Sequence, residues 1–131
     1  MTNTSKPFNF TKFAGFAVLA AVLNGIAFLI GKATDATMMV DQGGLREIAL
    51  PMVFAATLFP LLMAGAVTFG IGKNSPEFVS KAALIGGIFG VVTLFAPFLV
   101  AQDTGTGITL ASNHVIAGVI WYVGIKKSIK A

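Results

Sequence analysis

The chain carries one histidine, His114, inside an apolar stretch near its C-terminus, with Ser112 and Asn113 directly before it. An imidazole is the side chain whose ordinary pKa lies closest to neutrality. His114 could therefore act as a pH-sensitive gate in a permeation path, shuttle a proton or ligate a metal. Ser112 lies two residues from His114 and points off a different helix face, which disfavours a nucleophile and base pair. We therefore expect no catalytic residues and no enzyme activity.

The sequence supplies few partners for metal or nucleic-acid chemistry. It has no cysteine, and a lone histidine provides neither a metal cluster nor the ligand pair of a b-type haem. We thus expect no metal and no cofactor. The net charge of +4 comes from lysines at the ends of apolar segments, where membrane topology accounts for them better than nucleic-acid binding does.

Polar residues in the apolar segments fall at similar distances from one side of the membrane. Helical rise places His114 and Asn24 roughly 9 to 10 Å deep, and Thr93 and Thr57 roughly 12 to 14 Å deep. Pro97 removes a donor to the Thr93 carbonyl, which we predict to be free at this depth. The sequence predicts a polar cluster of Asn24, Thr57, Thr93, Asn113 and His114. The alternative is that these groups only hold neighbouring helices together through hydrogen bonds.

Four apolar runs must position this cluster, at residues 13–31, 48–71, 82–101 and 108–125. Each run is long enough to cross a bilayer, and charged residues make up 11% of the chain, where a soluble domain has about a quarter. The sequence predicts a single all-α domain, an integral membrane four-helix transmembrane bundle. Residues 42–44 and 102–107 are predicted as turns, and Ser75 with Pro76 as the start of the third helix.

Charge asymmetry predicts the orientation of the bundle. Four spans place both termini on one side, together with Lys6, Lys12, Lys73, Lys81, Lys126, Lys127 and Lys130. Because cytoplasmic loops are enriched in Lys and Arg, we predict both termini in the cytoplasm. Acidic residues gather on the opposite side, where we predict an outer mouth of Asp35, Asp41 and Asp103.

Small residues recur at helical spacing in the first and third runs. Such faces let helix backbones approach closely in lipid, and they predict helix packing through Ala17, Ala21, Gly86, Gly87 and Gly90. The pattern does not distinguish contacts within the chain from contacts between chains. Besides the lipid bilayer, the partners it allows are a second copy of the chain or another membrane protein.

Four features lie in order along the chain: Asn24-Gly25 in the first span, a polar first loop, Leu50-Pro51 at the entry of the second span, and Asn113-His114-Val115 in the last. In these features the chain resembles a bacterial family of uncharacterised four-span membrane proteins. The resemblance implies four helices, a location in the bacterial inner membrane and no particular activity. Two functional hypotheses follow: a pore or carrier for a small solute that uses the polar cluster, or a non-catalytic subunit or scaffold that docks a partner through its small-residue faces.

Overall fold

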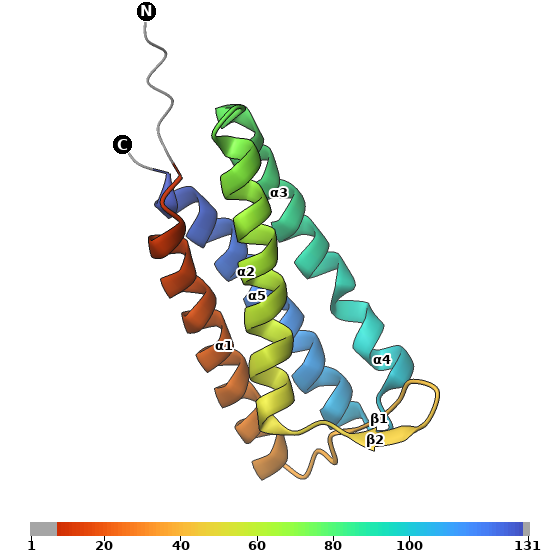
Figure 1. Cartoon of the computed structure of the whole chain (residues 1–131). Helices are drawn as coiled ribbons and strands as arrows, with labels where there is room; N and C mark the ends of the chain where they lie inside the picture. Colours follow the sequence, from red (N-terminus) through yellow and green to blue (C-terminus); the bar gives the residue numbers. More distant parts are fainter. Residues whose placement is uncertain (1–7, 130–131) are drawn as a thin grey trace, which may run out of the picture.

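The computed structural model describes residues 8–129, which are mostly helical (Figure 1). The long helices are α1 (Phe10–Ala33), α2 (Leu50–Gly72), α3 (Pro76–Val92) and α5 (Thr104–Ser128). A 3-10 turn, η1 (Thr93–Phe95), joins α3 to the short α4 (Ala96–Val100). Within residues 8–129, four helical segments are long and apolar enough to cross a membrane, the third being α3 through α4.

Side-chain caps set where two of the helices begin. Asn9 caps α1 by accepting a hydrogen bond from the Lys12 N–H at 3.1 Å. Asp103 caps α5 by accepting from the Thr106 N–H at 2.9 Å, so that α5 begins at Thr104. The predicted turn at 102–107 is therefore wrong over most of its length, because an N-cap aspartate turns those residues into the first helical turn.

The third helical segment changes from α-helix to a 3-10 turn just before Pro97. The ring of Pro97 cannot donate to a carbonyl one turn back, and the chain tightens into η1 just before it. In that 3-10 turn the Ala96 N–H donates to the Thr93 carbonyl. The prediction of a free Thr93 carbonyl is therefore wrong, since a tighter hydrogen-bonding pattern uses the group. The start of this segment is as expected, with Ser75 at the N-cap and Pro76 in the first turn.

The small-residue faces pack inside the chain, largely against α5. A methyl group built on Gly90 would lie 2.5 Å from the Cα of Gly118, so the two backbones are in direct contact. A methyl group on Gly86 would collide with the indole of Trp121, and one on Gly87 would lie 3.2 Å from the Cβ of Tyr122.

On α1, Ala17 and Ala21 are also buried. Ala17 belongs to a core cluster that includes Phe13 of α1 and Trp121 and Ile125 of α5. The small faces of α1 and α3 therefore both serve packing within the bundle.

An aromatic cluster fills the end of the bundle at which the described chain begins and stops, here called the terminal end. The rings of Phe13 and Trp121 meet edge to face with centroids 5.3 Å apart, and Phe8 and Phe69 pack beside them. The indole N–H of Trp121 donates to the Ala82 carbonyl at 2.8 Å. This end is thus closed by a dense apolar core.

A β-hairpin covers the opposite end, here called the hairpin end. Its strands are β1 (Met39–Asp41) and β2 (Leu45–Glu47), which pair antiparallel. The turn falls at 42–44 as predicted, with positive φ angles at Gly43 and Gly44. The prediction of an all-α chain is wrong in this segment, because strand pairing satisfies the backbone of the first connection. Val40 also bridges to Ala101, which fastens the hairpin to the α4–α5 connection.

Candidate functional site

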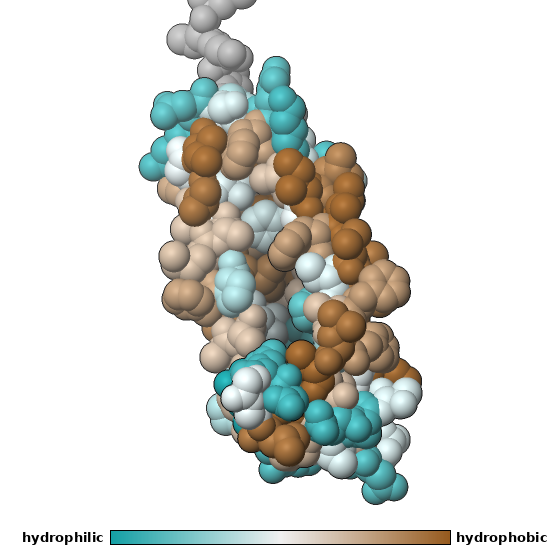
Figure 2. Space-filling view, turned by 90° about the vertical axis from the view of Figure 1, so that its right-hand side faces the viewer, coloured by the Kyte–Doolittle hydropathy of each residue, from teal (hydrophilic) through white to brown (hydrophobic). Residues whose placement is uncertain are grey.

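A cleft opens on one side of the bundle, towards the hairpin end. The helix α2 and the segment from η1 to α4 diverge as they approach the hairpin (Figure 1). A cleft of about 850 Å³ lies between them. α5 and one residue of α1 form its floor, and hairpin residues line its end. Figure 2 shows this face hollowed near its middle, with hydrophilic atoms in the hollow and hydrophobic side chains on its walls.

Asn24 of α1 ties three helices together in the floor of the cleft. Its Nδ2 donates to Thr57 Oγ1 of α2 at 2.9 Å and to the Asn113 carbonyl of α5 at 3.2 Å. The Thr57 hydroxyl in turn donates to the Val53 carbonyl at 2.8 Å. Asn24 is 1% exposed, so these bonds satisfy donors that burial would otherwise leave unpaired.

Thr93 and His114 meet across the η1–α5 contact. Thr93 Oγ1 lies 3.0 Å from His114 Nδ1, and 2.8 Å from the Phe89 carbonyl one turn back. Both side chains are half-buried and line the same cleft as Asn24. The histidine is therefore held by a fixed hydroxyl rather than by a charged group.

The structure brings all of the polar residues predicted from the sequence to this one cleft, where each lines the wall or floor: Asn24, Thr57, Thr93, Asn113 and His114. Two of their atoms stand out, the Oδ1 atoms of Asn24 and Asn113. Both are buried, and neither has a hydrogen-bond partner among the described residues. Buried polar atoms in native proteins usually have a hydrogen-bond partner, so these two acceptors mark the cluster as a candidate for more than helix packing.

The three aspartates predicted as an outer mouth lie at the hairpin end but serve the local backbone. Asp35 lies two residues beyond the end of α1 and adopts the left-handed region, with a φ of 69°. Asp41 accepts from the Gly44 N–H in the hairpin turn at 3.0 Å. Asp103 caps α5. None of the three is among the residues that line the cleft.

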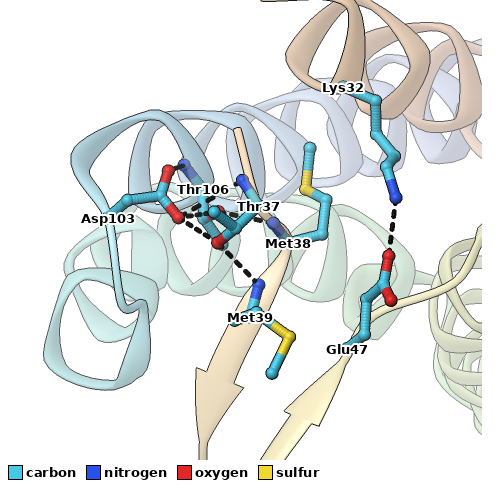
Figure 3. Close-up of polar contacts among 7 residues, drawn as sticks. All are labelled: Lys32, Thr37, Met38, Met39, Glu47, Asp103 and Thr106. Carbon is cyan, nitrogen blue, oxygen red and sulfur yellow. Dashed lines mark hydrogen bonds and ion pairs between the residues drawn. The ribbon is translucent and has the colours of Figure 1, made fainter. Parts of the chain in front are cut away.

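Asp103 fastens the hairpin end to α5 (Figure 3). Its carboxylate accepts from the hydroxyls of Thr37 and Thr106, and Thr106 Oγ1 accepts from the Met38 N–H at 2.8 Å. The hydrogen bonds from Thr37 and then from Thr106 lower the pKa of Asp103 from 3.8 to about 2. The charged form of Asp103 is thus part of the anchor that holds the hairpin over the cleft.

Arg46 and Gln42 of the hairpin line the end of the cleft, and sequence reasoning missed both. Arg46 Nη2 donates to Gln42 Oε1 at 2.5 Å. Among the residues that line the cleft, Arg46 carries the one formal positive charge, and no Asp or Glu lines it. Arg46 lies in the middle of β2, and only the prediction of that strand could have pointed to it. A segment of three residues is too short to distinguish a strand from a loop by its sequence pattern.

The cleft combines apolar walls with a few polar groups, an arrangement suited to binding a small molecule. No group of three or more His, Cys, Asp or Glu side chains in residues 8–129 could hold a metal ion. A smaller groove of about 370 Å³ between α3 and α5 is lined by aliphatic side chains, glycines and Tyr122. It offers little to orient a ligand, so the larger cleft is the candidate site.

Comparison with known proteins gives a family but no described relative. Residues 6–131 match a family described as "Family of unknown function (DUF6069)". No curated protein and no solved structure matches the chain significantly.

Proposed function

We propose that this chain, which belongs to the family of unknown function DUF6069, is a membrane protein that binds a small amphiphilic molecule in its lateral cleft. The observation that carries the proposal is the pairing of apolar walls with a floor that holds unpaired acceptors. Binding sites for small molecules are commonly apolar pockets with a few placed polar groups. A side opening would let such a molecule enter from the lipid.

A carrier or binding role has more support than a pore through a single chain. In residues 8–129 the aromatic cluster occupies the terminal end, where Phe13, Trp121 and Ile125 are all buried. A pore would need a continuous polar path, and the polar residues of the cleft stop short of that cluster. We therefore infer a binding site that is open at one side of the bundle.

The docking hypothesis has less support. The small residues on which it rests are occupied within the chain, as the contacts of Gly86 with Trp121 and of Gly90 with Gly118 illustrate. A partner would have to use other surfaces of the bundle. We keep docking as the second candidate, to be favoured if no small molecule binds.

We further propose that both termini face the bacterial cytoplasm. The supporting observation is charge: Lys12, Lys73, Lys81, Lys126 and Lys127 belong to the terminal end, whereas the hairpin end mixes Lys32 and Arg46 with acidic residues. Lys6 and Lys130 lie outside the described residues. Fusions of the C-terminus to green fluorescent protein and to alkaline phosphatase test this, since fluorescence without phosphatase activity is expected.

The binding proposal is tested with a pair of neighbouring alanines. Ala56 lines the cleft and Ala55 does not, although both are exposed on α2. Native mass spectrometry of protein extracted in mild detergent should reveal a bound small molecule in the native chain and in Ala55→Phe. The same molecule should be absent from Ala56→Phe, because the phenyl ring fills the cleft. Equal retention in both variants would place the molecule outside the cleft and overturn the proposal.

A further inference from the structure

The orientation of the Asn24 amide is fixed by its neighbours. Its Nδ2 faces the Asn113 carbonyl, which can only accept, and Thr57 Oγ1, whose hydrogen is used by Val53. Turning the amide over would place Oδ1 against two acceptors. Asn24 Oδ1 is thus the buried atom without a partner, and it can only accept a hydrogen bond.

The orientation of His114 follows from the single hydrogen of the Thr93 hydroxyl. Thr93 Oγ1 lies within 3.0 Å of two helix carbonyls, those of Phe89 and Gly90, as well as His114 Nδ1. If the hydroxyl donated to the ring, Oγ1 would face both carbonyl oxygens with no hydrogen between them. The hydroxyl therefore donates to a carbonyl and His114 Nδ1–H donates to Oγ1. In a neutral ring Nε2 is then an acceptor.

The floor of the cleft therefore carries acceptors that have no recorded partner among the described residues, and Asn113 Nδ2 beside them is a donor group with none recorded either. These acceptors are Asn24 Oδ1, Asn113 Oδ1 and His114 Nε2. The indole N–H of Trp121, which also lines the cleft, already donates to the Ala82 carbonyl. A ligand head that satisfies this floor must bring its own hydrogen-bond donor.

The donor of a ligand could be a charged ammonium group or an uncharged hydroxyl group, and the charges that line the cleft favour one of the two. An ammonium group would need a carboxylate partner in an apolar cleft, and none of the lining residues is Asp or Glu. Arg46 at the end of the cleft adds a positive charge that repels a cation. A hydroxyl group supplies a donor at no cost in charge.

We propose that the ligand is an uncharged amphiphile whose head carries a hydroxyl group, such as an apolar alcohol or phenol. The inference rests on the proposed binding function and adds the chemical class. The hydroxyl donates its hydrogen to one of the acceptors of the floor, which are Asn24 Oδ1, Asn113 Oδ1 and His114 Nε2. Its apolar body lies between α2 and the η1–α4 segment and leaves the cleft through the side opening.

The test compares two probes that differ in one hydrogen-bond donor, dodecanol and dodecyl methyl ether. Trp121 is the single tryptophan of the chain and lines the cleft, so its fluorescence reports occupancy in protein reconstituted into lipid nanodiscs. Dodecanol is expected to bind about tenfold more tightly than the ether, because the ether leaves a buried acceptor unpaired. Dodecyltrimethylammonium is expected not to compete.

A matched pair of variants locates the donor's partner. Asn113→Leu removes a side-chain amide whose Oδ1 no described residue uses, and it should reduce the preference for the alcohol over the ether. Ser112→Ala changes the neighbouring residue, which donates to the Ile108 carbonyl and does not line the cleft, and should keep the full preference.

The outcomes separate the chemical class from the binding function. If alcohol and ether bind equally and Ala56→Phe abolishes both, the cleft binds amphiphiles but the hydroxyl assignment is overturned. If neither probe gives a saturable change that Ala56→Phe removes, the proposed binding function fails along with it. A preference for the alcohol that Asn113→Leu leaves intact would move the contact away from Asn113 and contradict the proposed floor.

Discussion

The seam between α3 and α5 and the seam between α2 and the η1–α4 segment differ in how closely the helices approach. In the first seam, Gly90 and Gly118 bring two backbones into contact and Gly86 lies under the ring of Trp121. In the second, Ala56 and Ala96 face an open cleft and remain exposed. Both seams contain small residues, yet only one is closed.

The difference shows that small residues permit close approach but do not enforce it. The α3–α5 seam closes because a glycine on one helix meets a glycine on the other, which allows the backbones themselves to touch. In the open seam the 3-10 turn η1 and Pro97 interrupt the α-helix, and hairpin residues line the end of the cleft. A rigid seam thus supports a neighbouring cleft whose shape it fixes.

The largest expected effect comes from disturbing the closed seam with Gly90→Ala. The added methyl group meets the backbone of Gly118, which cannot move aside as a flexible side chain could. Overpacking of this kind costs about 2 kcal/mol, and we expect the unfolding free energy in detergent to fall by that amount. The measurement is thermal or denaturant unfolding monitored by circular dichroism.

Gly70→Ala is the matched control for this change. A methyl group on Gly70 meets nothing within 4 Å, so the same substitution in another helix should leave stability unchanged or raise it by up to about 1 kcal/mol. Equal destabilisation by both substitutions would show that the effect is not specific to the closed seam.

A smaller loss is expected when the asparagine that joins the helices is made apolar. Asn24→Leu removes the bonds to Thr57 and to the Asn113 carbonyl, and at about 0.6 kcal/mol each the cost is about 1 kcal/mol. Asn113→Leu, the same substitution on the neighbouring helix α5, removes no side-chain bond recorded among the described residues. We expect its unfolding free energy to stay within about 0.5 kcal/mol of the native value. A larger loss of unfolding free energy in Asn113→Leu than in Asn24→Leu would contradict the assignment of Asn24 as the asparagine that joins the helices.

The polar floor of the cleft could be predicted from the sequence because depth in a membrane helix follows from residue count. Asn24, Thr57 and His114 lie at one level because each is a fixed number of helical rises from a span end. The closed and open seams could not be predicted in the same way. Nearly every lipid-facing and core-facing position is apolar, so the sequence carries little record of which face meets which neighbour.

The hairpin could not be predicted from the sequence for a different reason. Its strands have three residues each, too short for alternation to be read, and their pairing depends on Val40 meeting Ala101 across the fold. Acidic residues there indicated a charged mouth. In the structure, Asp41 and Asp103 satisfy backbone N–H groups, and such caps are common roles for aspartate in turns.

Acid is expected to loosen the hairpin, which covers the end of the open seam. The pKa of Asp103 is lowered from 3.8 to about 2, so its contribution is present above pH 3.8 and is lost as the pH falls through about 2. Pepsin, which is active in this range, should cleave the hairpin faster as the pH falls across that window. Asp103→Asn keeps a neutral cap and should flatten this dependence. An unchanged profile in the variant would assign the transition to another carboxylate.

The smallest expected effect comes from the ion pair at the rim of the hairpin end. Lys32 Nζ lies 2.6 Å from Glu47 Oε1, but both side chains are about half exposed, so solvent and salt screen the attraction (Figure 3). Glu47→Gln should lower the unfolding free energy by about 0.5 kcal/mol at low salt and by less at high salt.

Glu77→Gln, which removes a longer and more exposed pair with Lys81, is the control for this change and should have a smaller effect still. A loss at Glu47 that persists in high salt would mean that Glu47 positions the hairpin by more than its charge. The cover of the cleft would then depend on β2 as well as on Asp103.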